Sequence, residues 1–132
     1  MCIRDSIFIK YQTNLTKVSV GKHSMFDYAP HFREIAVVGS IDGIGKTIEY
    51  MRRRTNWKEV EDNIKECGKY SNVVVDFNGL VSFLSVLRFY EVPEYVKTNP
   101  DIFQINWAML DTPKSLRPNN LPEELKKKLI PK

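Results

Sequence analysis

The sequence predicts an α/β fold built from parallel βα units, and two observations lead to this expectation. Four short apolar runs, each bounded by polar or turn-forming residues, are typical of buried strands. Segments with helical features separate these runs, and strands that alternate with helices favour a parallel sheet. The spacing leaves open whether the sheet stays flat or curls into a barrel, of which 132 residues would form about half, since a complete eight-unit barrel takes about 250 residues.

The expected strands follow one another along the chain with a helix between the second and third. That helix has the clearest signal, because Trp57, Val60, Ile64 and Cys67 recur at spacings of 3, 4 and 3 residues and share one helical face. Asn56 before it is a good N-cap, and Gly68 after it is a good stop. The four strands are expected at Ile7–Leu15, Glu34–Ile41, Asn72–Leu80 and Phe103–Leu110.

Three further segments have weaker helical signals. The mostly apolar run Leu80–Tyr90 predicts a second helix, which should end near Pro93. The segment 121–129 predicts a short amphipathic helix with Pro122 in its first turn. Residues 20–32 are expected to hold the first crossover, in which Pro30 limits any helix.

Composition and charge narrow the functional classes. The net charge is +4, and the two basic clusters, Arg52–Arg54 and Lys126–Lys128, lack the interleaved aromatic residues of a nucleic-acid groove. No apolar run approaches the length of a membrane span, and no signal peptide is visible. The expectation is a cytoplasmic protein without nucleic-acid or membrane partners. Cys2 and Cys67 match no metal-ligand or disulfide spacing.

The first six residues, "MCIRDS", resemble translated sequencing-adapter read-through. Residues 1–6 are therefore expected to be an artefactual leader, and residues 7–132 are expected to form the domain.

Polar residues gather where the expected strands end. Ser40 and Asp42 share a face of the second strand with apolar residues before them, and Asn78 is placed similarly on the third. Thr13 and Asn14 end the first strand. Parallel βα folds place their sites at this end of the sheet, although such residues also begin ordinary turns.

The stretch "GSIDGIGKT" invites a second interpretation, a phosphate-binding loop. Gly45, Lys46 and Thr47 match the end of that motif, but Ser40 stands where the first glycine belongs. Asp42 would also put a carboxylate into a loop that binds anions. A nucleotide-binding protein of this type stays as the alternative.

Four stretches together resemble the latter half of a radical S-adenosylmethionine (radical SAM) domain of the twitch/SPASM type, as found in phage and metagenomic proteins. They are "TNLT", "VVGSIDGIGKTIEYMRRRTNWKEVEDNI", "VVVDFNGLVSFLSVLRFYEVPEYV" and "INWAMLDTPKSLRPNNLPEELK". The resemblance implies a partial (β/α)6 TIM-like barrel that holds a [4Fe-4S] cluster and S-adenosylmethionine. Such an enzyme cleaves the cofactor reductively to a 5′-deoxyadenosyl radical, which takes hydrogen from a substrate; a peptide is one candidate.

The resemblance also implies roles for individual residues. Ser40 matches the residue that binds the amino-acid or ribose part of the cofactor, and Asp42 its neighbour that orients the loop or a ribose hydroxyl. Arg52 matches the arginine that pairs with the methionyl carboxylate, a role that suits its forked guanidinium. Thr13 and Asn14 match a "TN" strand end, and Asn78 lies where the next strand faces the cofactor.

The chain departs from the family in one important respect. The cluster-binding C-x-x-x-C-x-x-C and the "GGE" strand do not occur in its sequence, so no catalytic or metal-ligating residue is predicted. Residues 7–132 are expected to be a barrel domain truncated at both ends, inactive by itself. Besides the phosphate-loop protein, a non-catalytic βα interaction module remains an alternative.

Overall fold

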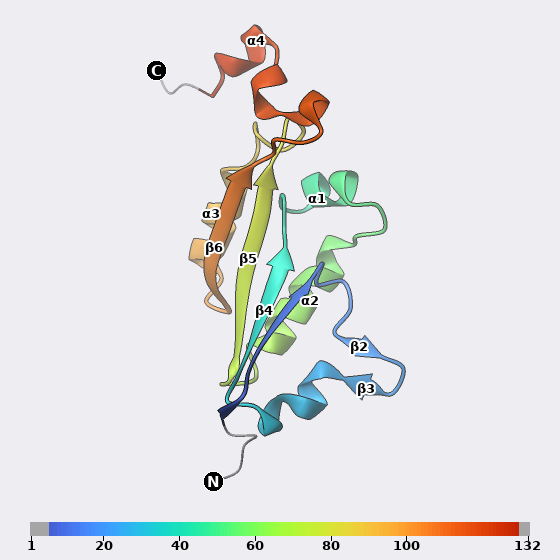
Figure 1. The fold of residues 1–132 in the computed structure, drawn as a ribbon. Coiled ribbons are helices and arrows are strands. Elements are labelled where there is room, and N and C mark those ends of the chain that lie inside the picture. Colours follow the sequence, from blue (N-terminus) through green and yellow to red (C-terminus); the bar gives the residue numbers. More distant parts are fainter. Residues whose placement is uncertain (1–5, 130–132) are drawn as a thin grey trace.

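A central parallel β-sheet organises the protein. In the computed structural model, which describes residues 6–129, β1 (Phe8–Thr13), β4 (Glu34–Ser40), β5 (Val73–Val81) and β6 (Ile102–Met109) form a sheet with strand order β1-β4-β5-β6 (Figure 1). Every neighbouring pair in this sheet is parallel. The predicted α/β class is therefore confirmed, and each observed strand lies within two residues of its expected bounds at either end.

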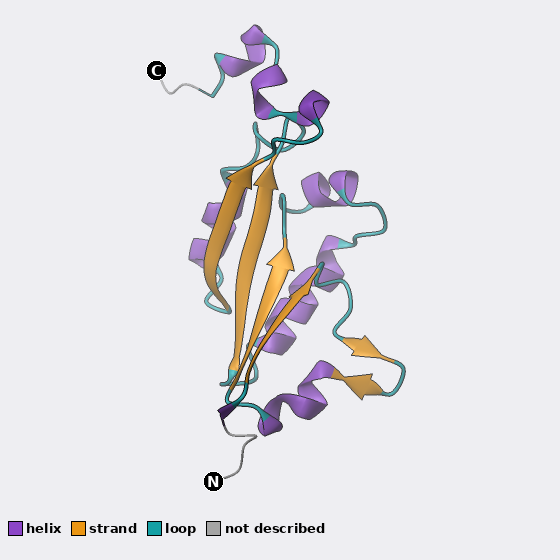
Figure 2. Ribbon diagram, viewed as in Figure 1, coloured by secondary structure: helices purple, strands orange, loops and turns teal. Residues whose placement is uncertain are grey.

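Helical segments connect the strands (Figure 2). The α-helices are α1 (Lys46–Met51), α2 (Trp57–Cys67), α3 (Glu91–Thr98) and α4 (Glu123–Lys126). The 3-10 helices are η2 (Met25–His31), η3 (Lys114–Leu116) and η4 (Pro118–Asn120). Helix α2 begins and ends as predicted, because the Asn56 side chain accepts a hydrogen bond from the Lys58 amide at 3.0 Å and Gly68 forms the C-cap. The short helix predicted within 121–129 is α4, preceded by Pro122.

The predicted helix over Leu80–Tyr90 is wrong. Its first two residues belong to β5, and the rest forms consecutive turns. Two serines explain the difference: the Ser82 amide donates to Ser85 Oγ at 3.0 Å and the Leu84 amide donates to Ser82 Oγ at 3.2 Å. Such side-chain bonds compete with helix formation. The helix starts instead at Glu91 and contains Pro93 in its first turn, where a proline is tolerated.

The first crossover contains no α-helix. It forms a hairpin of β2 (Ser19–Val20) and β3 (His23–Ser24), followed by η2, which includes Pro30. A capping box starts η2: the Ser24 side chain accepts from the Phe26 amide, and the Ser24 amide donates to Asp27 Oδ2. Pro30 was expected to limit helix formation here, and the segment that contains it is a 3-10 helix and not an α-helix.

The hydrophobic core lies on one face of the sheet. Ile35 and Val37 of β4 and Val75 and Phe77 of β5 are at most 4% exposed and pack with Val60, Ile64 and Cys67 of α2, Ile48 of α1 and Val92 of α3. We call this the helix-covered face. Helices α2 and α3 both lie behind the sheet in Figure 1.

The opposite face, here called the open face, carries the alternate residues of each strand. They include Lys10 of β1, Ala36, Val38 and Ser40 of β4, Asp76 and Asn78 of β5 and Gln104 of β6. Within residues 6–129 no helix packs on it (Figure 1). None of the helices in this part of the chain has the length and apolar character needed to cross a membrane. The proposed leader, apart from Ser6, lies outside the described residues.

Candidate functional site

Two of the predicted site residues are neighbours at the carboxyl end of the open face. Ser40, the last residue of β4, is the register partner of Asn78 on β5. Because both lie on the same side of adjacent parallel strands, their hydroxyl and amide groups face the same space. This edge is where parallel βα folds bind ligands.

Asp42 and Arg52 form the second pair that the structure brings together. Asp42 Oδ2 accepts a hydrogen bond from Arg52 Nε at 2.8 Å and lies 2.7 Å from Nη2. Its other oxygen, Oδ1, accepts from the Leu80 amide at 2.8 Å. The carboxylate therefore ties the loop after β4 both to the last turn of α1 and to the end of β5.

These contacts determine which hydrogen-bonding groups of Asp42 and Arg52 remain available to a ligand. Asp42 is only 8% exposed and both of its oxygens are used, so it holds the loop. The side chain of Arg52 is 32% exposed, and a guanidinium has more N–H donors than the two directed at Asp42. Asp42 thus positions an arginine that still has donors for an anionic group.

A glycine makes this close approach possible. A Cβ atom on Gly79 would lie 2.3 Å from the Ile41 carbonyl oxygen, which is backbone and has little freedom to move. The Ile41 amide in turn donates to the Asn78 carbonyl at 2.9 Å. The chain can therefore leave β4 against β5 only with glycine at this position, and that places Asp42 beside the Leu80 amide.

Thr13 and Asn14 make local contacts instead. Thr13 Oγ1 accepts from the Leu15 amide at 3.2 Å, and Asn14 Oδ1 accepts from Thr16 Oγ1 at 2.7 Å and from its amide at 3.2 Å. Leu15, which follows Asn14, has a φ of 60° and is fully buried. These two polar side chains stabilise the turn after β1, and Thr13 lies on the helix-covered side of its strand as the partner of Gly39.

The geometry of the glycine-rich loop gives little support to phosphate binding. Lys46 Nζ pairs with Glu49 at 3.1 Å, and the lysine side chain is 92% exposed. Helix α1, which would have to point its first amides at the phosphate, has only 6 residues.

The described residues do not fit an iron–sulfur cluster. Cys67 is fully buried in the core, and burial raises the pKa of its thiol from 9.0 to about 12. A cluster ligand has to be a thiolate, which this environment disfavours. Among residues 6–129 no three His, Cys, Asp or Glu side chains lie close enough together to hold a metal ion.

A cavity that sequence reasoning missed lies on the open face, nearer the amino ends of the strands. Its volume is about 410 Å³. Asp76 is 8% exposed and accepts from Gln104 Nε2 at 3.1 Å through Oδ2, whereas its buried Oδ1 has no hydrogen-bond partner among the described residues. Asp76 lies on this face because it alternates along β5 with Val74 and Asn78. The cavity is lined by Phe8, Lys10, Glu34, Ala36, Val74, Asp76, Phe103 and Gln104.

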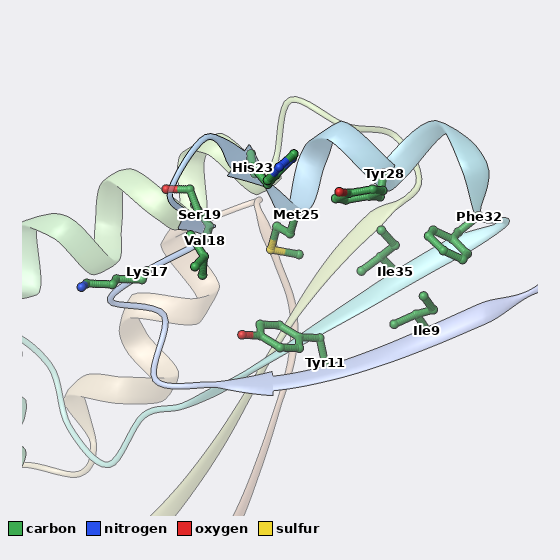
Figure 3. A pocket seen from close by; sticks show the side chains of 12 residues that line it. Ile9, Tyr11, Lys17, Val18, Ser19, His23, Met25, Tyr28, Phe32 and Ile35 are labelled. Atoms are coloured by element: carbon green, nitrogen blue, oxygen red, sulfur yellow. The ribbon is translucent and has the colours of Figure 1, made fainter.

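A second cavity, of about 420 Å³, lies on the other side of β1. Figure 3 shows Ile9 and Tyr11 of β1 along one wall and Met25 and Tyr28 of η2 opposite them. Most of its lining is apolar; Lys17 lies at one end, and His23 lies near Met25. It arises because a hairpin and a 3-10 helix, instead of an α-helix, cover this part of β1.

No protein-family model, curated protein or solved structure matches the chain.

Proposed function

We propose that this chain is a segment of a radical SAM barrel and that the carboxyl end of its sheet forms part of the wall that binds S-adenosylmethionine. The strand order supports the barrel: the strands follow one another in chain order, and α2 and α3 pack on the same face. A segment of a (β/α) barrel has this arrangement, with its open face turned to the barrel interior.

The observation that carries the proposal is the Asp42–Arg52 pair. It holds a guanidinium with free donors at the edge of the sheet where Ser40 and Asn78 also end. A positioned guanidinium can bind a carboxylate through two parallel hydrogen bonds. Of the two roles that the resemblance implies for Asp42, orienting the loop agrees best with its contacts, because the residue is 8% exposed and both of its oxygens already accept hydrogen bonds from Arg52 and the Leu80 amide.

The roles of these residues are limited to binding. Arg52 meets the methionyl carboxylate, Ser40 and Asn78 contribute a hydroxyl and an amide, and Asp42 fixes the arginine. Bound S-adenosylmethionine supplies the sulfonium chemistry for which the family is known. Since the described residues do not fit the cluster, we expect the isolated chain to bind the cofactor without cleaving it.

Calorimetric titration of the chain with S-adenosylhomocysteine and 5′-methylthioadenosine tests this proposal. The second ligand lacks the amino-acid carboxylate, so Arg52→Lys should weaken binding of the first about tenfold or more and leave the second unchanged. Arg53→Lys is the matched control, because the Arg53 side chain is exposed and makes no contact with Asp42. Circular dichroism checks that each variant is folded.

Two results would contradict the proposal. If the folded chain binds neither nucleoside, a non-catalytic interaction module becomes the better description. If it binds ATP with magnesium and Lys46→Ala removes that binding, the chain contains a phosphate loop after all.

A further inference from the structure

The open face contains a carboxylate oxygen for which the described residues provide no partner. Asp76 is 8% exposed, its Oδ2 accepts from Gln104, and its Oδ1 is buried without a hydrogen bond. A buried carboxylate oxygen left unpaired is costly, so native structures seldom retain one. A ligand that donates to this oxygen would remove the cost.

The surroundings of Asp76 indicate what kind of ligand fits. The cavity of about 410 Å³ places the aromatic rings of Phe8 and Phe103 and the small apolar side chains of Ala36 and Val74 around the carboxylate. Half of the lining residues are apolar and half are charged or polar, which suits an organic molecule that has both an apolar and a charged part. A hard divalent cation would need several oxygen ligands, and no group of three potential ligands exists among residues 6–129.

The charges in the cavity favour a single positive group. Asp76 and Glu34 supply two carboxylates, and Lys10 supplies one ammonium. Lys10 is exposed and lies on β1, two strands away from Asp76 on β5. In the described residues the ion pairs join other side chains, so Lys10 does not neutralise Asp76.

We propose that this cavity binds the alkylammonium group of a small organic cation. The ammonium donates to Asp76 Oδ1, and the alkyl part lies against Phe8 and Phe103, whose ring faces also attract cations. The site lies nearer the amino ends of the strands than Ser40 and Asp42. It is therefore independent of the proposed cofactor binding, and either proposal can fail without the other.

Amide chemical shifts of the ¹⁵N-labelled chain, titrated with n-butylammonium at constant ionic strength and neutral pH, test the proposal. We expect saturable shifts at Ala36, Asp76 and Gln104, and no comparable shifts with 1-butanol, which has the same alkyl chain without the charge. Asp76→Asn keeps an acceptor for Gln104 but removes the charge, and it should weaken butylammonium binding about tenfold or more. Glu34→Gln, in the same cavity, should weaken it less.

A Lys10→Met variant separates the proposal from an internal ion pair. If the cavity binds external cations, this variant should bind butylammonium at least as tightly as the original chain, because a like charge has been removed. Binding by Lys10→Met together with none by the original chain would mean that Lys10 itself occupies the site, and the proposal would be wrong. Equal responses to butylammonium and 1-butanol, or an unchanged affinity in Asp76→Asn, would also overturn it.

Discussion

The two faces of the sheet come from the same strands and differ in what they bury. On β5, Val75 and Phe77 point to the helix-covered face and are at most 1% exposed, whereas Asn78 on the open face is exposed. The aromatic rings of Phe77 and Tyr95 of α3 stack at 6.4 Å, which joins strand to helix. The open face instead keeps the cavity and the unpaired Asp76 oxygen. Packing on the helix-covered face stabilises the fold, and the open face leaves polar groups available to a ligand.

The largest expected effect compares neighbouring residues on the two faces. Phe77→Ala should lower the free energy of unfolding by about 3–5 kcal/mol, because it removes a fully buried ring from the core. Asn78→Ala, the next residue on the opposite face, should change it by no more than about 0.5 kcal/mol. Urea denaturation of both variants measures the difference. Similar losses in both would mean that the open face also carries the fold.

A smaller effect concerns the pair at the carboxyl edge, where the two faces meet. Asp42→Asn should cost about 1–3 kcal/mol of unfolding free energy, because Arg52 loses its charged partner in a largely buried place. Glu94→Gln breaks an exposed pair with Lys97 and should cost about 0.5 kcal/mol or less. Urea denaturation at fixed salt again gives both values. An equal cost would show that the Asp42–Arg52 pair behaves as an ordinary surface pair.

Sequence reasoning located the fold well wherever the pattern was periodic. The apolar spacing in α2 reflects burial on a single face, and the apolar run of β4 reflects a central strand that is buried on both faces. In both cases the local sequence suffices to predict the element. Sequence reasoning failed at Leu80–Tyr90. The apolar pattern there is typical of a helix, but the hydrogen bonds to the side chains of Ser82 and Ser85 stabilise turns instead. Such bonds depend on side-chain geometry that composition does not reveal.

The candidate site was predictable in part for the same reason. Strand alternation correctly placed Ser40 and Asn78 on one face. The contact between Asp42 and Arg52 depends on the position of α1, which brings Arg52 back to the loop after β4, and on the close approach of Gly79 to Ile41. No local sequence pattern predicts either feature. Asp76 shares a face with Asn78 by the same alternation, but that one of its oxygens is unpaired follows only from the structure, where Gln104 of β6 donates to the other oxygen.

The last expected effect appears only at alkaline pH and belongs to the helix-covered face. Burial raises the pKa of the Tyr95 hydroxyl from 10.0 to about 12, and it raises that of the Cys67 thiol from 9.0 to about 12. The folded chain thus keeps these protons to higher pH than the unfolded chain does. Below pH 9.0 these two groups should therefore not lower the free energy of unfolding. As the pH rises from there towards about 12, the free energy of unfolding should fall.

Tyr95→Phe isolates the tyrosine part of this dependence. The variant cannot ionise at this position, so its stability should fall less steeply with pH above 10.0 than that of the original chain. Tyr50→Phe is the control, because Tyr50 is 79% exposed and its replacement should leave the slope unchanged. Urea denaturation across this pH range compares the three chains. Equal slopes in all three would mean that water reaches Tyr95 beneath α3, and the helix-covered face would then be less well sealed than its packing indicates.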